Sequence, residues 1–300
     1  MLEHIDKVNL EAFEKKYPFK DTIHISKESF QKMLQKKDLH YVWLPACPRA
    51  NRITSVFRKY HLEEWMTEHR LSPYYQLEKG WIFPKEDEFF TRGLIQAYFP
   101  ANIKATQPFL YSEKEKRIVS NDTYHMSMMM ASVMDEMNKV ASKDSLFPKE
   151  YRDMLQKWNA WIYEAVNLKI YQVAAMKGNK RTTGCAQLEE IYQFLDTYLE
   201  KKDYLYADQL TEADLRLFHN LVRHEFYYRQ FKVFQKPLSA FRFLTRYVEH
   251  LLESHPDLKK DLYFDEIKIT HFRSPHNIKK YGYIEEIPSL RSLFPFENTQ

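Results

Sequence analysis

A run of apolar residues that leads into a cysteine and a proline constrains this chain more than any other feature. The run occupies positions 41–44 (Tyr-Val-Trp-Leu), and Cys47-Pro48 follow after one short turn. Beyond them, apolar side chains recur at helical spacing as far as about His61. Proline suits the first position of a helix, where its missing N–H would have no partner anyway. The pattern therefore predicts a buried strand, a turn and a helix whose first turn holds Cys47 and Pro48.

The expected position of Cys47 gives its thiol an unusual environment. Backbone N–H groups without partners and the helix dipole both stabilise an anion at the start of a helix, and Arg49 and Arg52 lie within one turn. An ordinary thiol with a pKa of about 8.5 is about 3% thiolate at pH 7, and lowering that pKa by roughly two units makes it mostly thiolate. A buried core cysteine is the alternative. The strand before Cys47 and the proline after it favour a nucleophile.

Length and composition exclude several classes of protein. Three hundred residues predict two domains or one large one. The 45 basic and 41 acidic residues give a formal charge of +4, too small to indicate a nucleic acid or an anionic membrane as partner. Cys47 and Cys185 lie far apart, and the 12 histidines show no metal-ligand spacing, so we expect no metal site. No signal peptide and no run of ~20 apolar residues is visible, which predicts a soluble, cytoplasmic protein without a membrane segment.

The first half of the chain mixes strands and helices. Residues 1–38 are charged and contain one expected helix, at about 26–36, so we interpret them as an N-terminal extension. Residues 104–111 are expected to form a strand with Pro108 near its start, because proline cannot donate to a ladder. A polar turn and a return strand at 117–119 complete a hairpin. Residues 71–102 lie between the Cys47 helix and this hairpin. They are irregular and aromatic, with helical patterning only around 92–99, and they include Trp81.

A methionine-rich helix is expected at about 124–140, directly after Asn121-Asp122-Thr123. Asn or Asp before such a helix is an N-cap signal. The functional alternative is that Asp122 and Thr123 face the amine and the carboxylate of a ligand. The methionines are expected to be packing residues.

The second half is helical in pattern. After a polar linker at 139–149, helices are expected at about 155–173, 188–199 and 238–252. Thr211-Glu212-Ala213-Asp214 has the form of a capping box at the start of another helix. The sequence thus predicts an extension at 1–38, an α/β domain at 39–140 and an all-helical domain with a C-terminal extension at 150–300.

In this order, the parts resemble a glutathione transferase, in which a thioredoxin-like α/β domain precedes an all-α domain. More narrowly, residues 40–290 resemble the Xi class, the glutathionyl-hydroquinone reductases. The fragments that carry this resemblance are Cys47-Pro48 with Ala50 and Arg52, Gly80-Trp81 with Phe83, Ile118-Val119 with Asn121, Val166-Asn167 with Ile170-Tyr171, and the stretches 211–218 and 267–274.

The resemblance implies a glutathione site in the α/β domain. Asp122 and Thr123, where the family usually has Glu-Ser, would hold the γ-glutamyl end. Gln107, where the family usually has valine, would precede Pro108 in a cis peptide and pair by its backbone with the cysteine of glutathione. Lys104 would hold the glycyl carboxylate, and Trp81 would lie against the same ligand.

The resemblance also implies a site for an aromatic substrate, with Tyr171 and Tyr228 as donors to its oxygens. The sequence departs from the family at Arg49 and Asn51, which replace an aromatic residue and a histidine, and at His271-Phe272, where two tyrosines are usual. A homodimer is expected from the family.

The resemblance implies thiol transfer. The Cys47 thiolate would take glutathione from a glutathionylated hydroquinone or a similar thioether, and a second glutathione would resolve the mixed disulfide. Two alternatives remain open. Cys47 could reduce glutathione mixed disulfides in the manner of a glutaredoxin, or the chain could be a non-catalytic interaction module that keeps only the fold.

Overall fold

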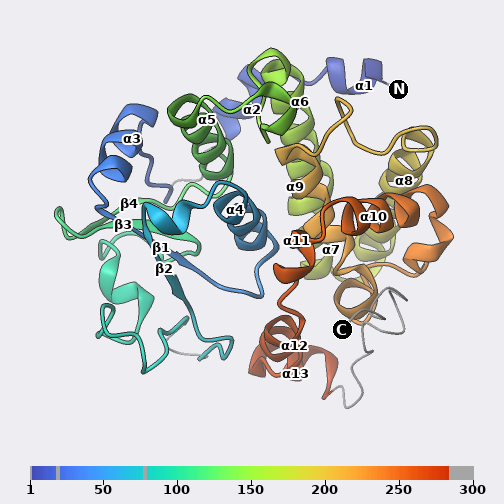
Figure 1. The fold of residues 1–300 in the computed structure, drawn as a ribbon. Helices are drawn as coiled ribbons and strands as arrows, with labels where there is room; N and C mark the ends of the chain where they lie inside the picture. The colour runs from blue at the N-terminus through green and yellow to red at the C-terminus, as the bar shows by residue number, and fades with distance from the viewer. Residues whose placement is uncertain (1, 18–20, 77–79, 284–300) are drawn as a thin grey trace. The chain divides into compact units, whose positions relative to one another are not determined.

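The computed structural model of the protein describes residues 2–17, 21–76 and 80–283, which form two compact units (Figure 1). The sheet unit comprises residues 11–146 and 261–283, and the helical unit comprises residues 2–10 and 147–260. An α/β part and an all-helical part are therefore present, as the sequence predicts. Residues 11–38, expected as an extension, and residues 261–283, expected in the helical domain, group with the sheet. The last part of the expected C-terminal extension, 284–300, lies outside the described residues.

A four-stranded mixed sheet in the order β2-β1-β3-β4 is the centre of the sheet unit. The strands are β1 (Leu39–Trp43), β2 (Thr67–Arg70), β3 (Phe109–Ser112) and β4 (Arg117–Ser120). β1 pairs in parallel with β2 and antiparallel with β3, and β3 and β4 form the expected hairpin. All five residues of β1 are buried, as expected for a strand covered on both faces.

Strand β2 is absent from the sequence prediction. Its residues, Thr-Glu-His-Arg, are all polar and are exposed or half-buried. An edge strand of this kind has no apolar alternation, so the usual signal for a strand is missing.

The helices around the sheet follow the local sequence signals closely. α3 (Lys27–Gln35) begins after Ser26, whose side chain accepts a hydrogen bond from the Ser29 N–H. α4 (Pro48–Lys59) has Pro48 at its start and Cys47 as its N-cap, one position before the first turn. α4 packs on β1 through the stacked rings of Tyr41 and Phe57, whose centroids are 5.4 Å apart. The remaining helices of this unit are α2 (Leu10–Lys16), α5 (Met126–Asn138), α12 (Phe264–Phe272), α13 (Pro275–Tyr281) and the 3₁₀ turns η1 (Leu62–Glu64), η2 (Ile95–Tyr98) and η3 (Ser142–Asp144).

The helical unit contains two π-helical segments that the sequence does not predict. The helix expected at 155–173 consists of α6 (Arg152–Ile162), the π-helical η5 (Tyr163–Leu168) and α7 (Lys169–Ala175). A second π-helical segment, η6 (His224–Tyr228), follows α9 (Glu212–Leu221). π-Helical segments are rare in proteins, and those that occur often lie at functional sites. The remaining elements are α1 (Leu2–Asp6), α8 (Gly178–Tyr198), α10 (Arg242–Ser254), α11 (Asp257–Lys260) and the 3₁₀ turns η4 (Lys149–Tyr151) and η7 (Leu238–Ala240).

The predicted capping box at the start of α9 is confirmed. Asp214 Oδ2 accepts hydrogen bonds from the Thr211 N–H at 2.9 Å and from the Thr211 hydroxyl at 2.7 Å. One turn further along the buried face of α9, Arg216 and Glu212 form an ion pair at 2.8 Å, and neither side chain is exposed. Within the described part of the chain, no helix combines the length and the apolar character needed to cross a membrane.

Candidate active site

Cys47 lies at the junction of strand and helix that the sequence predicts. Its backbone is extended (φ −87°, ψ 122°), and its carbonyl accepts the first hydrogen bond of α4, from the Asn51 N–H at 2.9 Å. The residue is buried, with 8% of its surface exposed. This geometry directs the first N–H groups of α4 toward the thiol.

Opposing effects set the pKa of the Cys47 thiol. Burial raises it, but the charge of Arg49, hydrogen bonds from the backbone N–H groups of Ala50 and Arg49, and a hydrogen bond from the Gln107 side chain together lower it below its ordinary value. Of the two arginines that the sequence places beside the cysteine, Arg49 supplies the charge, whereas Arg52 donates to the carbonyl of Thr123. The thiolate is therefore favoured by local donors as well as by the helix dipole.

The loop before β3 brings a second predicted residue to the sulfur. The peptide bond between Gln107 and Pro108 is cis, as the family resemblance implies, and Pro108 is buried at the start of β3. The side-chain amide of Gln107 bonds to Cys47, while its Oε1 atom is buried and no donor among the described residues reaches it. Gln107 thus contacts the Cys47 sulfur through its side chain, a contact that the sequence did not predict.

Asn121 joins this loop to the turn that precedes α5. Its Nδ2 donates to the Thr106 hydroxyl at 2.9 Å, and its backbone N–H donates to the carbonyl of Ile23 at 3.1 Å. Arg52 approaches the same turn from α4 through its bond to Thr123. The structure therefore places Cys47, Gln107, Asp122 and Thr123 at the same end of β1, β3 and β4.

The carboxylate of Asp122 accepts four hydrogen bonds and also contacts the ring of His24. Oδ1 accepts from the Tyr17 hydroxyl at 2.8 Å and from the N–H groups of Tyr124 and His125 at 3.1 and 3.2 Å. Oδ2 lies 2.8 Å from the Nδ1 atoms of both His24 and His125. Burial raises the pKa of Asp122, but the bonds from His125 and Tyr17 outweigh it and lower the pKa to about 2. α5 itself begins at Met126 with His125 as N-cap, so Asp122 acts one turn earlier than a simple cap would.

The residues around Asp122 also form a group of potential ligand atoms. His24, Asp122 and His125 each offer one such atom within 4.8 Å of the others, and Glu14 Oε1 lies 3.1 Å from His125 Nε2. A divalent cation could be held by such a set, although in the structure His125 is hydrogen-bonded to both Asp122 and Glu14. His24 is far in the sequence from Asp122 and His125, which are three positions apart, so no sequence spacing reveals the group.

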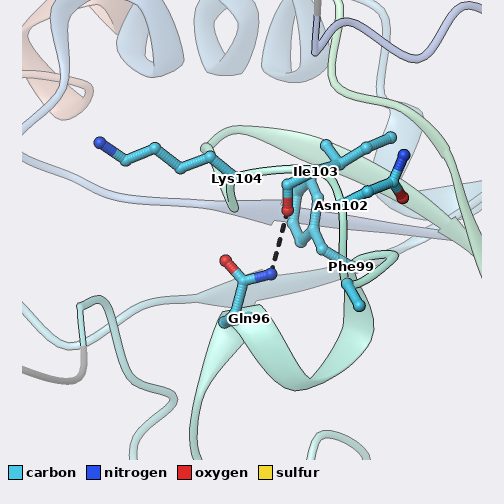
Figure 2. Close-up of a pocket in the computed structure, with 6 residues that line it drawn as sticks. Gln96, Phe99, Asn102, Ile103 and Lys104 are labelled. Atoms are coloured by element: carbon cyan, nitrogen blue, oxygen red, sulfur yellow. Dashed lines mark hydrogen bonds between the residues drawn. The ribbon is translucent and has the colours of Figure 1, made fainter.

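Trp81 and Lys104 lie in the irregular segment between β2 and β3. Trp81 is half-buried and meets the edge of Tyr75 at 4.8 Å between ring centroids. Lys104 is exposed at the rim of a hollow of about 590 Å³, and its side chain extends away from Phe99 and Asn102 (Figure 2). Of the predicted site residues in the described part of the chain, Lys104 alone lines this hollow.

Gln96 fixes the backbone on both sides of Lys104. Its Nε2 donates to the carbonyl of Ile103 at 3.0 Å, as Figure 2 shows, and its Oε1 accepts from the Ala105 N–H at 2.9 Å. The position of Lys104 therefore depends on a residue that the sequence did not single out.

The two predicted tyrosines belong to the helical unit and lie beside its π-helical segments. Tyr171 is in α7, directly after η5, and Tyr228 is the last residue of η6. The Tyr228 hydroxyl is buried and donates to Asn220 Oδ1 at 3.0 Å. Burial, reinforced by the nearby Tyr171, raises the pKa of Tyr228, so this hydroxyl keeps its proton.

A hydrogen-bonded chain links these segments. Asn220 Nδ2 donates to the carbonyl of Arg216 at 3.1 Å, and Asn167 Nδ2 in η5 bonds to the same oxygen at 3.4 Å. One carbonyl thus connects the two π-helical regions through Asn220 to Tyr228.

The sequence of the chain is similar to that of known proteins. Residues 171–250 match the family model described as "Glutathione S-transferase, C-terminal domain". Glutathionyl-hydroquinone reductase YqjG of Escherichia coli (strain K12) is 27% identical over 266 residues, which cover 84% of this chain and 80% of the relative. Glutathionyl-hydroquinone reductase PcpF of Sphingobium chlorophenolicum is 28% identical over 261 residues, 81% of this chain and 80% of the relative.

Solved structures agree with the sequence comparisons. The glutathione-bound structure of YqjG from Escherichia coli K-12 superposes with a TM-score of 0.75 and 26% identity, over 84% of this chain and 85% of that one. The glutathione-S-transferase Xi from Phanerochaete chrysosporium gives a TM-score of 0.75 and 25% identity, over 84% of this chain and 90% of that one.

Proposed function

We propose that this chain, a relative of the Xi-class glutathione transferases in sequence and in fold, removes glutathione from glutathionylated hydroquinones or similar aromatic thioethers. The observation that carries the proposal is the environment of Cys47. Its thiol lies at the start of α4, accepts hydrogen bonds from two backbone N–H groups and from Gln107, and has a lowered pKa despite its burial. A thiolate so held is a nucleophile at neutral pH.

The reaction consists of two exchanges at sulfur. The Cys47 thiolate attacks the glutathione sulfur of the thioether, a sulfur–sulfur bond forms, and the carbon–sulfur bond breaks. The electron pair of the broken bond passes to the aromatic carbon, which takes a proton, so the hydroquinone is released reduced. The thiolate of a second glutathione then attacks the glutathione sulfur of the mixed disulfide, giving oxidised glutathione and the Cys47 thiolate.

The remaining predicted residues take binding and donor roles in this proposal. Asp122 and Thr123 receive the γ-glutamyl end of glutathione. The backbone of Gln107, before Pro108, pairs with the cysteine of glutathione. Lys104 receives the glycyl carboxylate, and Trp81 packs against the ligand. Tyr171 and Tyr228 donate hydrogen bonds to the quinol oxygens. The raised pKa keeps Tyr228 protonated, and its hydroxyl has to turn from Asn220 Oδ1 to reach the substrate. A homodimer remains a prediction from the family resemblance.

Intact-mass measurement after exposure to glutathione disulfide tests the chemistry at Cys47. We expect one glutathione to be added to the wild-type chain and to Cys185→Ser, and none to Cys47→Ser. Cys185 is a matched control because it is the other cysteine of the chain and burial raises the pKa of its thiol. Addition at Cys185, or at neither cysteine, contradicts the proposal, and failure to bind glutathione at all would favour a non-catalytic module.

A substrate panel separates thioether reduction from the glutaredoxin-like alternative. We expect the wild-type chain to release hydroquinone from a glutathionylated hydroquinone, and Tyr171→Phe and Tyr228→Phe to lower kcat by about 100-fold or more. Reduction of a mixed disulfide between glutathione and a small thiol needs no proton donor to a quinol, so the same variants should leave it unchanged. Activity on the disulfide alone would favour the alternative.

A further inference from the structure

The Asp122 carboxylate is already saturated by donors from the protein itself. A carboxylate offers about four lone-pair positions. Four N–H and O–H groups donate hydrogen bonds to Asp122, and His24 Nδ1 makes a further contact with Oδ2 at 2.8 Å. If Asp122 receives the ammonium group of glutathione, as proposed above, one of these groups has to leave. The structure indicates which one.

Two of the side-chain donors are fixed from several directions. His125 donates to Asp122 through its backbone and its ring, and its other ring nitrogen lies 3.1 Å from Glu14 Oε1. The Tyr17 hydroxyl both donates to Asp122 and accepts from the Tyr124 N–H at 3.2 Å, and its ring is packed against Phe13 with 4% of the residue exposed. Displacing either group would break further contacts.

His24 differs from both. Its side chain is 42% exposed, and its Nδ1 atom contacts Asp122 Oδ2. The chain beside it is held independently, because the N–H of Ile23 donates to Asn121 Oδ1 at 2.7 Å and the carbonyl of Ile23 accepts from the Asn121 N–H. The imidazole can therefore rotate into solvent while the backbone stays in place.

We propose that His24 occupies, on Asp122 Oδ2, the position that the α-ammonium group of glutathione takes on binding, and that His24 thereby sets the affinity of the site for its thiol. The exchange replaces the His24 ring nitrogen beside Oδ2 by an ammonium donor, and it leaves His125 on the same oxygen and three donors on Oδ1. An ammonium group is the better partner for an ionised carboxylate because it brings a full charge as well as a donor. This inference rests on the proposed function and adds a specificity residue from the N-terminal segment.

Titration calorimetry with two ligands tests the exchange in the full chain. The ligands are S-methylglutathione, whose sulfur cannot react with Cys47 by thiol exchange, and its desamino analogue, in which a glutaryl group replaces the γ-glutamyl group. We expect His24→Ala to bind S-methylglutathione about five-fold more tightly than wild type, the scale of one hydrogen bond, and to bind the desamino analogue unchanged. His24→Gln keeps a donor at similar reach and should restore the wild-type Kd.

The outcomes distinguish the two proposals. If His24→Ala binds S-methylglutathione with an unchanged or higher Kd, or if its Kd changes equally for both ligands, the role of His24 is overturned while glutathione binding stands. Absence of binding of both ligands by wild type and variants overturns the proposed function and this inference with it. The side chain is partly exposed, so we expect Tm to change little, and a large loss of Tm in His24→Ala would itself contradict an exchangeable contact.

Discussion

Tyr17 and Asp122 are joined by a 2.8 Å hydrogen bond although 105 positions separate them in the sequence. The same hydroxyl accepts a hydrogen bond from the Tyr124 N–H, so Tyr17 connects the N-terminal segment to the turn before α5 twice. The segment that the sequence shows only as a charged extension is therefore part of the wall of the candidate glutathione site.

The network around Asp122 predicts a pH-dependent contribution to stability. The pKa of Asp122 falls from 3.8 to about 2 in the folded chain, so its stabilisation is present above the unfolded pKa and is lost as the pH drops through the folded value. Asp122→Asn should lower the free energy of unfolding by about 2 kcal/mol at pH 7. Urea unfolding should show this difference shrinking between about pH 4 and pH 2. A difference that stays constant over that range would contradict the assignment.

Gln107 should tune the reactivity of Cys47. Because its side-chain amide donates to the sulfur, Gln107→Val removes a stabilising contact of the thiolate and should raise the pKa of Cys47 by about one unit. The rate of alkylation by iodoacetamide, followed against pH in a Cys185→Ser background, measures this pKa. Gln107→Glu places a negative charge at the same point and should raise it further. An unchanged midpoint in both variants would remove Gln107 from the reactive site.

Gln96 should affect glutathione binding without touching the sulfur. Its side chain holds the backbone on both sides of Lys104. Gln96→Ala should therefore raise the Kd for glutathione by about five-fold, the scale of one neutral hydrogen bond. Lys104→Ala should raise it by about ten-fold, the scale of one charge-assisted hydrogen bond. Asn102→Ala is a matched control, because Asn102 lines the same hollow. The alkylation rate of Cys47 should stay at the wild-type value in all three. Equal effects of Asn102→Ala and Gln96→Ala would argue against positioning.

The buried ion pair of α9 should dominate the stability of the helical unit. Glu212→Ala leaves the Arg216 guanidinium buried without its carboxylate and should cost about 3–5 kcal/mol. Glu11 and Lys15 form a pair with the same i,i+4 spacing at 2.6 Å on α2, but both side chains are largely exposed. Glu11→Ala should therefore leave the unfolding midpoint unchanged in urea. Comparable losses from both variants would show that burial does not decide the effect.

Local sequence patterns determined the elements whose signals lie within a few residues. The apolar run before Cys47, Pro48 at the start of α4 and Thr211 with Asp214 at the start of α9 each satisfy a backbone requirement at their own position. These features predicted a strand, a helix and a capping box that the structure contains.

The tertiary structure alone decided what surrounds Cys47 and Asp122. β2 carries no apolar alternation and exists because β1 offers it a free edge, and the π-helical segments beside Tyr171 and Tyr228 follow from packing between helices. Tyr17 and His24 contact Asp122, and Gln107 contacts Cys47, although these partners are far apart in the sequence and no spacing predicts the contacts. Periodicity reports which face of an element is buried, whereas hydrogen-bond partners and pKa values depend on which distant side chains share that buried space.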